Sequence, residues 1–297
     1  MKIAVLMSTY NGEKYIRTQI ESILSQKTDA EVKLIVRDDG SKDKTLDILK
    51  EYGIDYYTGN NLGPAGSFID LVKRTEGYDY YAFADQDDYW MENKLEESMK
   101  LLRQISGPGL MYSNPEVVDK ELVTYGRRVY RKKPYTNMET VVCAGNIIGC
   151  TIMFNEELAQ YIRKHRLPQH IKMHDYYLAA VCVSIGGSIR FDDNSYMKYR
   201  QHGNNTEGVP VSKLQTLLNR IGEVKTKSKV SISEQAAEIL TEYGTDITED
   251  AKRWLTKVSQ YRNNPINRLA LAISLKTHYI TFNKSISTRA AILLGNR

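Results

Sequence analysis

The chain has 297 residues, of which 41% are hydrophobic and 26% are charged, a composition typical of a folded globular protein. It argues against an intrinsically disordered protein, a collagen and a multi-span membrane protein. The formal net charge of +5 is unevenly divided, because residues 251–297 contain nine Lys or Arg and no Asp or Glu. Subtracting those nine from the 41 basic residues leaves 32 against 36 acidic residues, so residues 1–250 carry −4. An acidic body with a basic tail predicts no nucleic-acid partner for the protein as a whole.

Cysteine usage and hydropathy indicate the compartment. The three cysteines, at positions 143, 150 and 182, have neither the number of a disulfide framework nor the spacing of a zinc site, which favours a reducing interior. The apolar run at the N-terminus is too short for the core of a signal peptide. No run approaches the roughly 18 to 20 apolar residues that cross a bilayer. We therefore expect a cytoplasmic protein, either soluble or peripheral on the inner face of the plasma membrane.

Strand and helix patterns alternate over the first 115 residues. The expected strands are residues 3–7, 32–36, 56–58, 80–84 and 109–113. The expected helices are residues 15–26, 41–52, with Ser41 as the N-cap, 67–74 and 94–104. This alternation predicts an α/β fold with a doubly wound, mostly parallel sheet.

The pattern is looser after residue 115. Residues 120–135 resemble a basic, mobile loop. Further strands are expected at 147–155, 188–191 and 196–200, and further helices at 156–165 and 174–185. From residue 212 onward the pattern is helical, with breaks near 228–231 and 263–265, which predicts a C-terminal α-helical appendage.

Polar clusters follow three of the predicted strands, at residues 8–12, 38–41 and 85–88. The carboxyl ends of parallel strands lie at one edge of a sheet, and ligands of doubly wound sheets bind there. We therefore expect the three clusters to converge in one cleft.

The acidic cluster contains Asp85, Asp87 and Asp88 directly after an apolar strand. Carboxylates this close repel one another unless a cation neutralises them, and hard oxygen ligands suit Mg²⁺ or Mn²⁺. The alternative is an acidic first turn of the following helix, stabilised by the helix dipole. Its position at a strand end, near a second acidic turn, favours the metal site.

The other clusters are open to two interpretations each. Residues 38–41 form either a plain strand-to-helix turn or a carboxylate site for a base N–H or ribose hydroxyls. Asp175, at the start of an apolar helix, is either a dipole partner of that helix or a general base. His202 is either an ordinary loop histidine or a metal ligand. The chain has no G-x-G-x-x-G and no Walker A motif, and the glycines of residues 61–66 match no phosphate loop.

Taken together and in this order, the motifs resemble those of the inverting family 2 glycosyltransferases, which have a GT-A fold. The motifs are STYNG at 8–12, DDGSKDKT at 38–45, ADQDDYW at 84–90, MHDYY at 173–177 and YRQHGNN at 199–205. The combination looks most like the bacterial rhamnosyltransferase-like branch that builds capsule, O-antigen or cell-wall polysaccharide. The resemblance implies a catalytic domain over residues 1–210, with a nucleotide-binding half to 115 and an acceptor half from 116. It leaves 211–297 as a basic helical C-terminal region.

The resemblance implies roles for individual residues. Those matching the family's nucleotide site are Thr9, Tyr10, Asn11, Gly63, Asp85 on the ribose side, and Asp39 or Asp38 for the pyrimidine base. The resemblance also makes Asp87 and His202 ligands of Mn²⁺ or Mg²⁺, Asp88 a contact of the donor sugar, and Asp175 the catalytic base. Tyr176 and Tyr177 stand where relatives often carry two tryptophans that contact the acceptor, which leaves the acceptor's identity open.

The implied reaction is a single in-line displacement on a nucleotide sugar, with a lipid-linked saccharide as the expected acceptor. The resemblance to the rhamnosyltransferase-like branch favours dTDP-rhamnose as donor, with a UDP-hexose as the alternative. The alternatives are a nucleotidyltransferase that makes the nucleotide sugar and a non-catalytic module that binds it. Residues 251–297 mix apolar and basic side chains, with helices expected at 266–282 and 286–294. They are suited either to an anionic membrane surface or to packing on the body or on a second subunit of a homo-oligomer.

Overall fold

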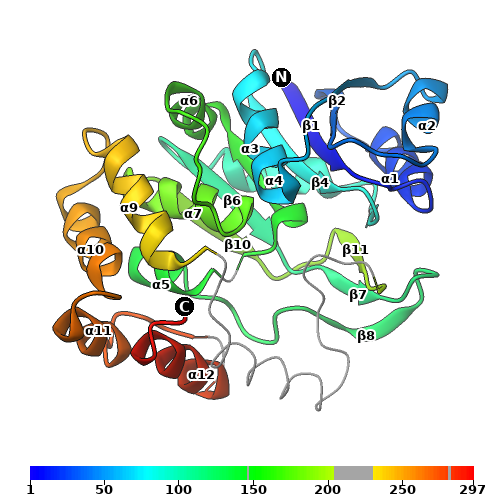
Figure 1. The fold of residues 1–297 in the computed structure, drawn as a ribbon. Helices are drawn as coiled ribbons and strands as arrows, with labels where there is room; N and C mark the ends of the chain where they lie inside the picture. The colour runs from blue at the N-terminus through cyan, green and yellow to red at the C-terminus, as the bar shows by residue number, and fades with distance from the viewer. Residues whose placement is uncertain (146, 204–229, 280–281) are drawn as a thin grey trace. The chain divides into compact units, whose positions relative to one another are not determined.

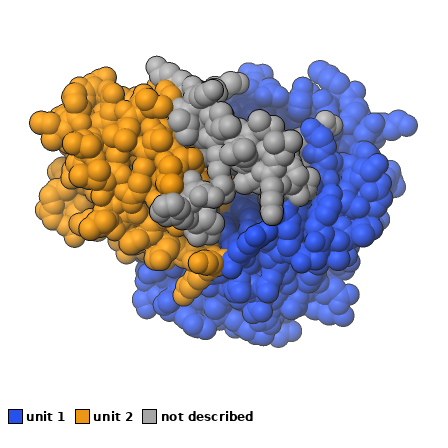
Figure 2. Space-filling model, turned by 90° about the horizontal axis from the view of Figure 1, so that it is seen from below, with its two compact units in different colours: residues 1–131, 148–167, 188–208 blue, residues 132–147, 168–187, 209–297 orange. Residues whose placement is uncertain are grey.

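The computed structural model describes residues 1–145, 147–203, 230–279 and 282–297 (Figure 1). The chain forms two compact units, which Figure 2 colours separately. Unit 1 comprises residues 1–131, 148–167 and 188–208, and unit 2 comprises residues 132–147, 168–187 and 209–297. Two segments that precede the expected boundary at residue 210 therefore belong to the same unit as the C-terminal helices.

Unit 1 is built around a seven-stranded sheet of order β10-β6-β9-β4-β1-β2-β3. Its strands are β1 (Lys2–Thr9), β2 (Glu31–Asp38), β3 (Asp55–Thr58), β4 (Tyr80–Asp85), β6 (Gly109–Ser113), β9 (Met153–Asn155) and β10 (Ser188–Asp192). All neighbouring strands pair in parallel except β9, which runs antiparallel to β4 and β6. The predicted α/β class with a mostly parallel sheet is confirmed.

The strand order locates the binding edge. The chain proceeds outward from β1 to β2 and β3, then returns to place β4 on the other side of β1. Such a reversal leaves a crevice at the carboxyl ends of the two central strands, where ligands of open α/β sheets bind. Residues 3–7 of β1 are fully buried, so the strand that carries the first polar loop is rigidly held in the core.

Five helices of unit 1 connect or cover these strands. They are α1 (Ile16–Leu24), α2 (Thr45–Glu51), α3 (Gly63–Arg74), α4 (Lys94–Leu102) and α6 (Glu156–Lys164). Two of them begin elsewhere than expected. The N-cap prediction for Ser41 is wrong, since its hydroxyl bonds to Asp38 and α2 begins at Thr45. Helix α3 begins four residues early, at Gly63, whose φ of 66° suits glycine, and Pro64 occupies the first turn.

A second sheet of unit 1 has the order β5-β11-β7-β8. Its strands are β5 (Tyr89–Trp90), β7 (Glu116–Val118), β8 (Thr124–Arg128) and β11 (Met197–Arg200). Strands β7 and β8 form an antiparallel hairpin, so residues 124–128 of the expected basic loop form a strand. Strand β11 pairs with β5 directly after the acidic cluster, which delivers the 199–203 segment to the carboxyl end of β4.

Unit 2 is helical in the part that the structure describes. Its helices are α5 (Met138–Ala144), α7 (His174–Ser184), α9 (Ile232–Tyr243), α10 (Glu249–Gln260), α11 (Pro265–Ala272) and α12 (Phe282–Leu293). Side chains of Ser231, Thr248 and Asn264 cap α9, α10 and α11. The expected break near 263–265 is confirmed, but the expected helix over 266–282 ends at Ala272.

Some expectations fall outside the described residues, namely those for residues 204–205 and 211–229 and for the junction at 280–281. Among the described residues, no helix has the length and apolar character to cross a membrane.

Candidate active site

The carboxyl ends of β1, β2 and β4 bring the first three polar clusters together. In the sheet register, Thr9 of β1 lies opposite Asp38 of β2, and Ser8 lies opposite Asp85 of β4. The side chain of Thr9 donates a hydrogen bond of 3.0 Å to Asp38 Oδ2. The expected convergence of the three clusters is confirmed.

The carboxylate of Asp38 is fully buried and accepts hydrogen bonds on both oxygens. Oδ1 accepts from the backbone N–H groups of Gly40 and Ser41, at 3.0 and 2.8 Å. Oδ2 accepts from the hydroxyls of Thr9 and Ser41. These four donors belong to the two loops, so Asp38 holds the loops in place and is poorly placed to receive a ligand.

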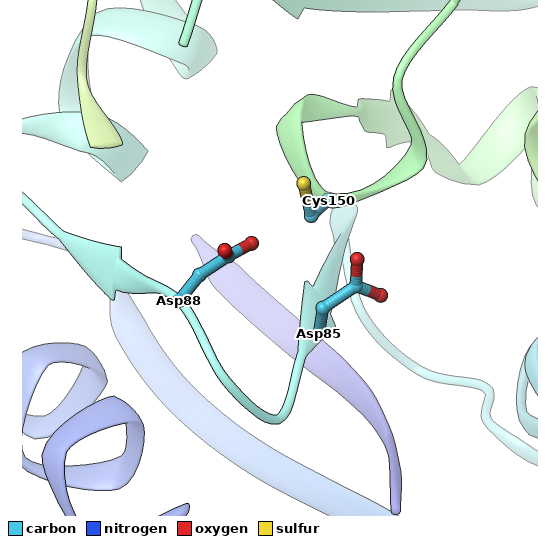
Figure 3. A group of neighbouring side chains, drawn as sticks. All are labelled: Asp85, Asp88 and Cys150. Atoms are coloured by element: carbon cyan, nitrogen blue, oxygen red, sulfur yellow. The ribbon is translucent and has the colours of Figure 1, made fainter. Parts of the chain in front are cut away.

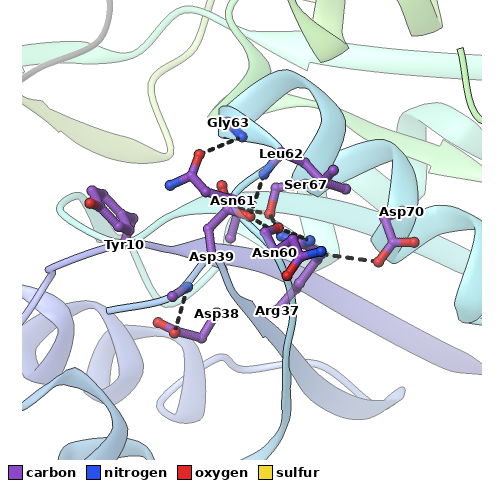
Figure 4. Close-up of polar contacts among 12 residues, drawn as sticks. Tyr10, Arg37, Asp38, Asp39, Asn60, Asn61, Leu62, Gly63, Ser67 and Asp70 are labelled. Carbon is purple, nitrogen blue, oxygen red and sulfur yellow. Dashed lines mark hydrogen bonds and ion pairs between the residues drawn. The ribbon is translucent and has the colours of Figure 1, made fainter. Parts of the chain in front are cut away.

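The neighbouring carboxylate of Asp39 has one occupied and one available oxygen (Figure 4). Oδ1 accepts from the guanidinium of Arg37 and from the backbone N–H of Leu62, the latter at 2.9 Å. The hydrogen bonds of the Asp39 carboxylate within the described residues all go to Oδ1, and Oδ2 receives none. Of the two candidates for reading the base, the geometry therefore favours Asp39.

The first loop is tied to the other two clusters. Asn11 has a φ of 48°, its N–H donates to Ser41 Oγ, and its side-chain oxygen accepts from the N–H of Lys42, both at 2.8 Å. Gln86 bonds to the N–H and the C=O of Tyr10, at 3.0 and 3.1 Å. A Cβ at Gly12 would lie 2.2 Å from Gln86 Oε1, so a larger residue there would displace the Gln86 side chain from Tyr10. The ring of Tyr10 stays 49% exposed at this edge.

A cavity of about 510 Å³ opens at the same edge, within the size range of small-molecule sites. Its lining residues are Tyr10, Asn11, Gly12, Lys14, Tyr15, Gln86, Asp87, Lys120, His202 and Gly203. Lys14, Gln86 and Lys120 were not among the residues predicted for the site. Of these three, only Gln86 could have been predicted, because it lies between Asp85 and Asp87 in the acidic motif. The two lysines supply positive charge suited to an anionic group.

The acidic cluster is crowded. Ligand atoms of Asp85, Asp88 and Cys150 lie within 4.8 Å of one another, and Figure 3 shows the three side chains pointing toward one another. Asp88 is fully buried, and its Oδ1 accepts from the N–H of Arg200 at 3.0 Å. Its Oδ2 has no hydrogen-bond partner among the described residues. Loss of solvation and the charge of Asp87 raise the pKa of Asp85 to about 7 and that of Asp88 well above its ordinary value.

Cys150 was not expected at this site. It comes from the 3₁₀ turn Gly149–Thr151, far from the acidic motif in sequence, and it is buried. Burial raises the pKa of its thiol well above the ordinary value, so it faces the two carboxylates as a neutral group. The position of Cys150 in the sequence gave no indication that it lies beside Asp85 and Asp88.

The two residues predicted to bind the metal meet in the structure. Nε2 of His202 lies 2.7 Å from Oδ2 of Asp87. The imidazole stacks on Tyr15, with ring centroids 4.9 Å apart and an interplanar angle of 25°. The guanidinium of Arg200 donates to the backbone carbonyl of Asp87 at 2.6 Å. Carboxylate oxygens with one imidazole suit Mn²⁺ or Mg²⁺. The carboxyl groups of Asp85 and Asp88 lie close together, and Oδ2 of Asp88 has no hydrogen-bond partner among the described residues, so a cation there would relieve the repulsion between them. The residues therefore fit a divalent ion.

The remaining predicted residues belong to unit 2. Asp175 is in the first turn of α7, is 6% exposed, and its Oδ1 accepts from the N–H of Tyr176 at 2.8 Å. Burial lowers the pKa of the adjacent His174 to about 3, so this imidazole is neutral. The ring of Tyr176 lies against Gly145, where an added Cβ would be 2.5 Å from it.

The placement of Tyr177 contradicts its expected role at the acceptor. Its side chain is fully buried in unit 2, and its hydroxyl lies 3.2 Å from that of Tyr243. A ring without exposed surface has no face for a sugar. Tyr177 is therefore a core residue of the helical unit.

The family model for glycosyl transferase family 2 matches residues 4–205, more than half of the chain. The chain belongs to glycosyltransferase family 2. It is 31% identical over 241 residues to dTDP-rhamnosyl transferase RfbG of Shigella flexneri, covering 74% of this chain and 80% of that protein. The protein is thus an enzyme, a glycosyltransferase with a nucleotide-sugar donor.

Solved structures bear out the GT-A fold. The crystal structure of S. aureus TarS 1–349 superposes with a TM-score of 0.57 at 18% identity, over 93% of this chain and 76% of that chain. The mannosyltransferase PcManGT from Pyrobaculum calidifontis, solved in complex with GDP-Man and Mn²⁺, gives a TM-score of 0.53 at 15% identity. That match covers 98% of this chain and 73% of that chain.

Proposed function

We propose that the protein is an inverting, metal-dependent glycosyltransferase that moves a sugar from a nucleoside diphosphate to a hydroxyl of a growing cell-surface polysaccharide. The observation that carries this proposal is the pairing of Asp87 with His202 beside the crowded acidic cluster and the nucleotide loop. The identity to a dTDP-rhamnosyl transferase supports dTDP-rhamnose as donor, with a UDP-hexose as the second candidate.

The loops of β1 and β2 bind the nucleoside in this proposal. Oδ2 of Asp39 accepts the N3–H of thymine or uracil, and the exposed ring of Tyr10 stacks on the base. Thr9, Asn11 and Asp38 set the shape of the two loops, as their mutual hydrogen bonds support. Gly63 is the first residue of α3, and its neighbour Leu62 donates its N–H to Asp39, which keeps Gly63 near the nucleotide. Asp85 faces the ribose.

The diphosphate end is bound next to the carboxyl end of β4. Asp87 and His202 hold Mn²⁺ or Mg²⁺, which when bound stabilises the charge that develops on the diphosphate leaving group. Lys14 and Lys120, which line the cavity, add positive charge for the phosphates. Asp88 is fully buried beside Asp85, so in this proposal it supports the ion's site rather than the predicted contact with the donor sugar.

Asp175 acts as the general base, with Tyr176 beside the acceptor. The acceptor hydroxyl loses its proton to Asp175 while its oxygen bonds to the anomeric carbon. The bond from that carbon to the diphosphate oxygen breaks on the opposite face, so the anomeric configuration inverts.

The acceptor in this proposal is a lipid-linked saccharide, reached from an anionic membrane surface through residues 251–297. Ile266, Leu269 and Ile273 are 78, 54 and 64% exposed at helical spacing on and just after α11, which supports an apolar contact. Arg289 and Arg297 donate to backbone carbonyls within unit 2, so part of the positive charge of residues 251–297 is used internally. Contact between these three apolar side chains and those of a second copy of the chain would instead form a homo-oligomer.

Liposome flotation decides between these two contacts. The membrane proposal predicts that anionic vesicles float the wild-type protein and fail to float an Ile266→Ser/Leu269→Ser/Ile273→Ser variant. Equal flotation of both proteins would contradict it, and an oligomer that the variant abolishes would favour the second copy.

A donor panel tests the reaction itself. The protein is incubated with dTDP-rhamnose, UDP-hexoses and GDP-mannose in Mn²⁺ or Mg²⁺, and release of the nucleoside diphosphate is measured. The proposal predicts release from a thymine or uracil donor. Pyrophosphate formed from a nucleoside triphosphate and a sugar 1-phosphate would indicate the nucleotidyltransferase instead, and donor binding without turnover would indicate the binding module.

A further inference from the structure

Arg37, near the end of β2, is a buried cation that the reaction described above does not use. Its side chain is 3% exposed, and all its contacts lie at the nucleotide edge of unit 1. Nη1 donates to Asp39 Oδ1 and, at 2.8 Å, to Ser67 Oγ. Nη2 donates to the carbonyl of Asn60 at 2.8 Å, and Nε donates to Asp70 Oδ2 at 3.0 Å (Figure 4).

These contacts connect three separate pieces of the fold. Arg37 and Asp39 are two positions apart at the end of a strand and so share a face, with Asp38 on the other. Asn60 belongs to the turn after β3, and Ser67 and Asp70 belong to α3. A single planar guanidinium thus fixes the Asp39 carboxylate to the turn and to the helix.

The approach of Arg37 depends on a glycine. A Cβ at Gly59 would lie 2.7 Å from Arg37 Nη2, so any other residue there displaces the end of the guanidinium. This gives a way to move Arg37 without removing its charge.

The bonds of Arg37 determine which oxygen of Asp39 a ligand meets. Arg37 and the Leu62 N–H both bond to Oδ1, which leaves Oδ2 available. We propose that Arg37 is the positioning residue for nucleobase recognition, because it orients Asp39 to accept a ring N–H of the base and ties that orientation to α3. The proposal rests on the proposed function, in which Asp39 reads the base.

The chemistry of the bases makes this orientation a specificity determinant. Uracil and thymine carry a hydrogen on N3, which a carboxylate accepts. Cytosine has the same size and an unprotonated N3, which repels a carboxylate oxygen. A fixed Asp39 therefore favours uracil and thymine over cytosine, and a carboxylate free to turn loses this discrimination.

Titration calorimetry with UDP and CDP at fixed Mn²⁺ tests the proposal. The wild-type protein should bind UDP at least about tenfold more tightly than CDP, the range of a hydrogen bond to a charged group. In Arg37→Gln the ratio should fall to within about threefold, while CDP affinity changes little. Arg37→Lys keeps the positive charge but lacks the several N–H donors of the guanidinium. It should therefore restore only part of the preference for UDP over CDP.

Arg74→Gln is the matched control. Arg74 is 64% exposed and bonds to the same Asp70, but it has no contact with Asp39. Its removal should leave the UDP to CDP ratio unchanged. A loss of the ratio in Arg74→Gln equal to that in Arg37→Gln would overturn the proposal, because it would assign the effect to Asp70.

The same measurement separates the role of Asp39 from the role of Arg37. Equal binding of UDP and CDP by the wild-type protein would overturn the assignment of Asp39 in the proposed function, and the role of Arg37 with it. A wild-type preference that Arg37→Gln retains would overturn the role of Arg37 alone. If circular dichroism shows that Arg37→Gln does not fold, Gly59→Ala takes its place, with the same fall expected and a retained ratio again contradicting the proposal.

Discussion

The carboxylates at the ends of β2 and β4 are held in opposite ways. At β2, Asp38 accepts four hydrogen bonds, and Asp39 pairs with a buried arginine. At β4, one oxygen of Asp88 has no hydrogen-bond partner in the part of the chain that the structure describes, and the pKa of Asp85 is raised to about 7. The protein itself therefore completes the first region, whereas the second requires a proton or a cation. We infer that base recognition is built into the fold and that diphosphate binding is completed by a divalent ion.

The largest expected effect lies outside both regions and separates binding from chemistry. Asp175→Asn should lower transfer about 10³- to 10⁴-fold, since an amide does not accept the acceptor proton. Donor affinity, measured by calorimetry, should be nearly unchanged. Asp250→Asn is the control, because Asp250 is also an acid in the first turn of a helix of unit 2. Wild-type turnover in Asp175→Asn would show that this acid serves only the helix dipole.

The second prediction addresses the β4 region alone. Asp87→Ala should lower UDP affinity in Mn²⁺ about 100-fold and remove its dependence on Mn²⁺, because a ligand of the ion is lost. Binding of uridine, which lacks the diphosphate, should stay the same. Asp47→Ala, at an exposed acid of α2, serves as control. UDP affinity in Asp87→Ala that still rises with Mn²⁺ as in the wild type would refute the metal role of Asp87.

The third prediction uses the raised pKa of Asp85. Between about pH 4 and pH 7 the folded protein retains a proton that the unfolded chain releases, so stability falls as the pH rises through this range. The metal-free protein should have a Tm several degrees higher at pH 5 than at pH 7.5, and Mn²⁺ should raise the Tm more at pH 7.5. Asp85→Asn should flatten this slope. An unchanged slope in that variant would place the titrating group elsewhere.

The smallest effect should appear at the β2 region. Ser41→Ala removes a donor to Asp38 and the acceptor of the Asn11 N–H, at a cost of about 1–2 kcal/mol of unfolding free energy. Uridine affinity should fall a few-fold with or without Mn²⁺. Ser25→Ala, at an exposed hydroxyl bonded only to a local carbonyl, is the control. If Ser41→Ala lowered uridine affinity only in the presence of Mn²⁺, base recognition at β2 would depend on the ion, which would contradict the difference drawn between the β2 and β4 regions.

The same contrast shows what the sequence could predict. The convergence of the three polar clusters followed from the alternation of strands and helices, because parallel strands align their carboxyl ends. The choice between Asp38 and Asp39 depends on how far Arg37 reaches toward α3, and no local pattern encodes that reach. Cys150 and Arg200 join the acidic cluster from distant parts of the chain, so spacing gave no sign of them.

Unit 2 was harder to predict for a different reason. Helix α7 is apolar on most of its surface, so its sequence does not show which side faces solvent, and the burial of Tyr177 could not be foreseen. The inclusion of residues 132–147 and 168–187 in the helical unit depends on tertiary packing. Caps were more visible: Asn264 followed by Pro265 marked the start of α11.

The most direct test of the account is release of nucleoside diphosphate from dTDP-rhamnose and UDP-hexoses, with Mn²⁺ and with a chelator, by the wild-type protein and by Asp87→Ala. The account predicts release from at least one of these donors that requires both Mn²⁺ and the Asp87 carboxylate. Release at the same rate in the chelator, or by Asp87→Ala, would contradict it.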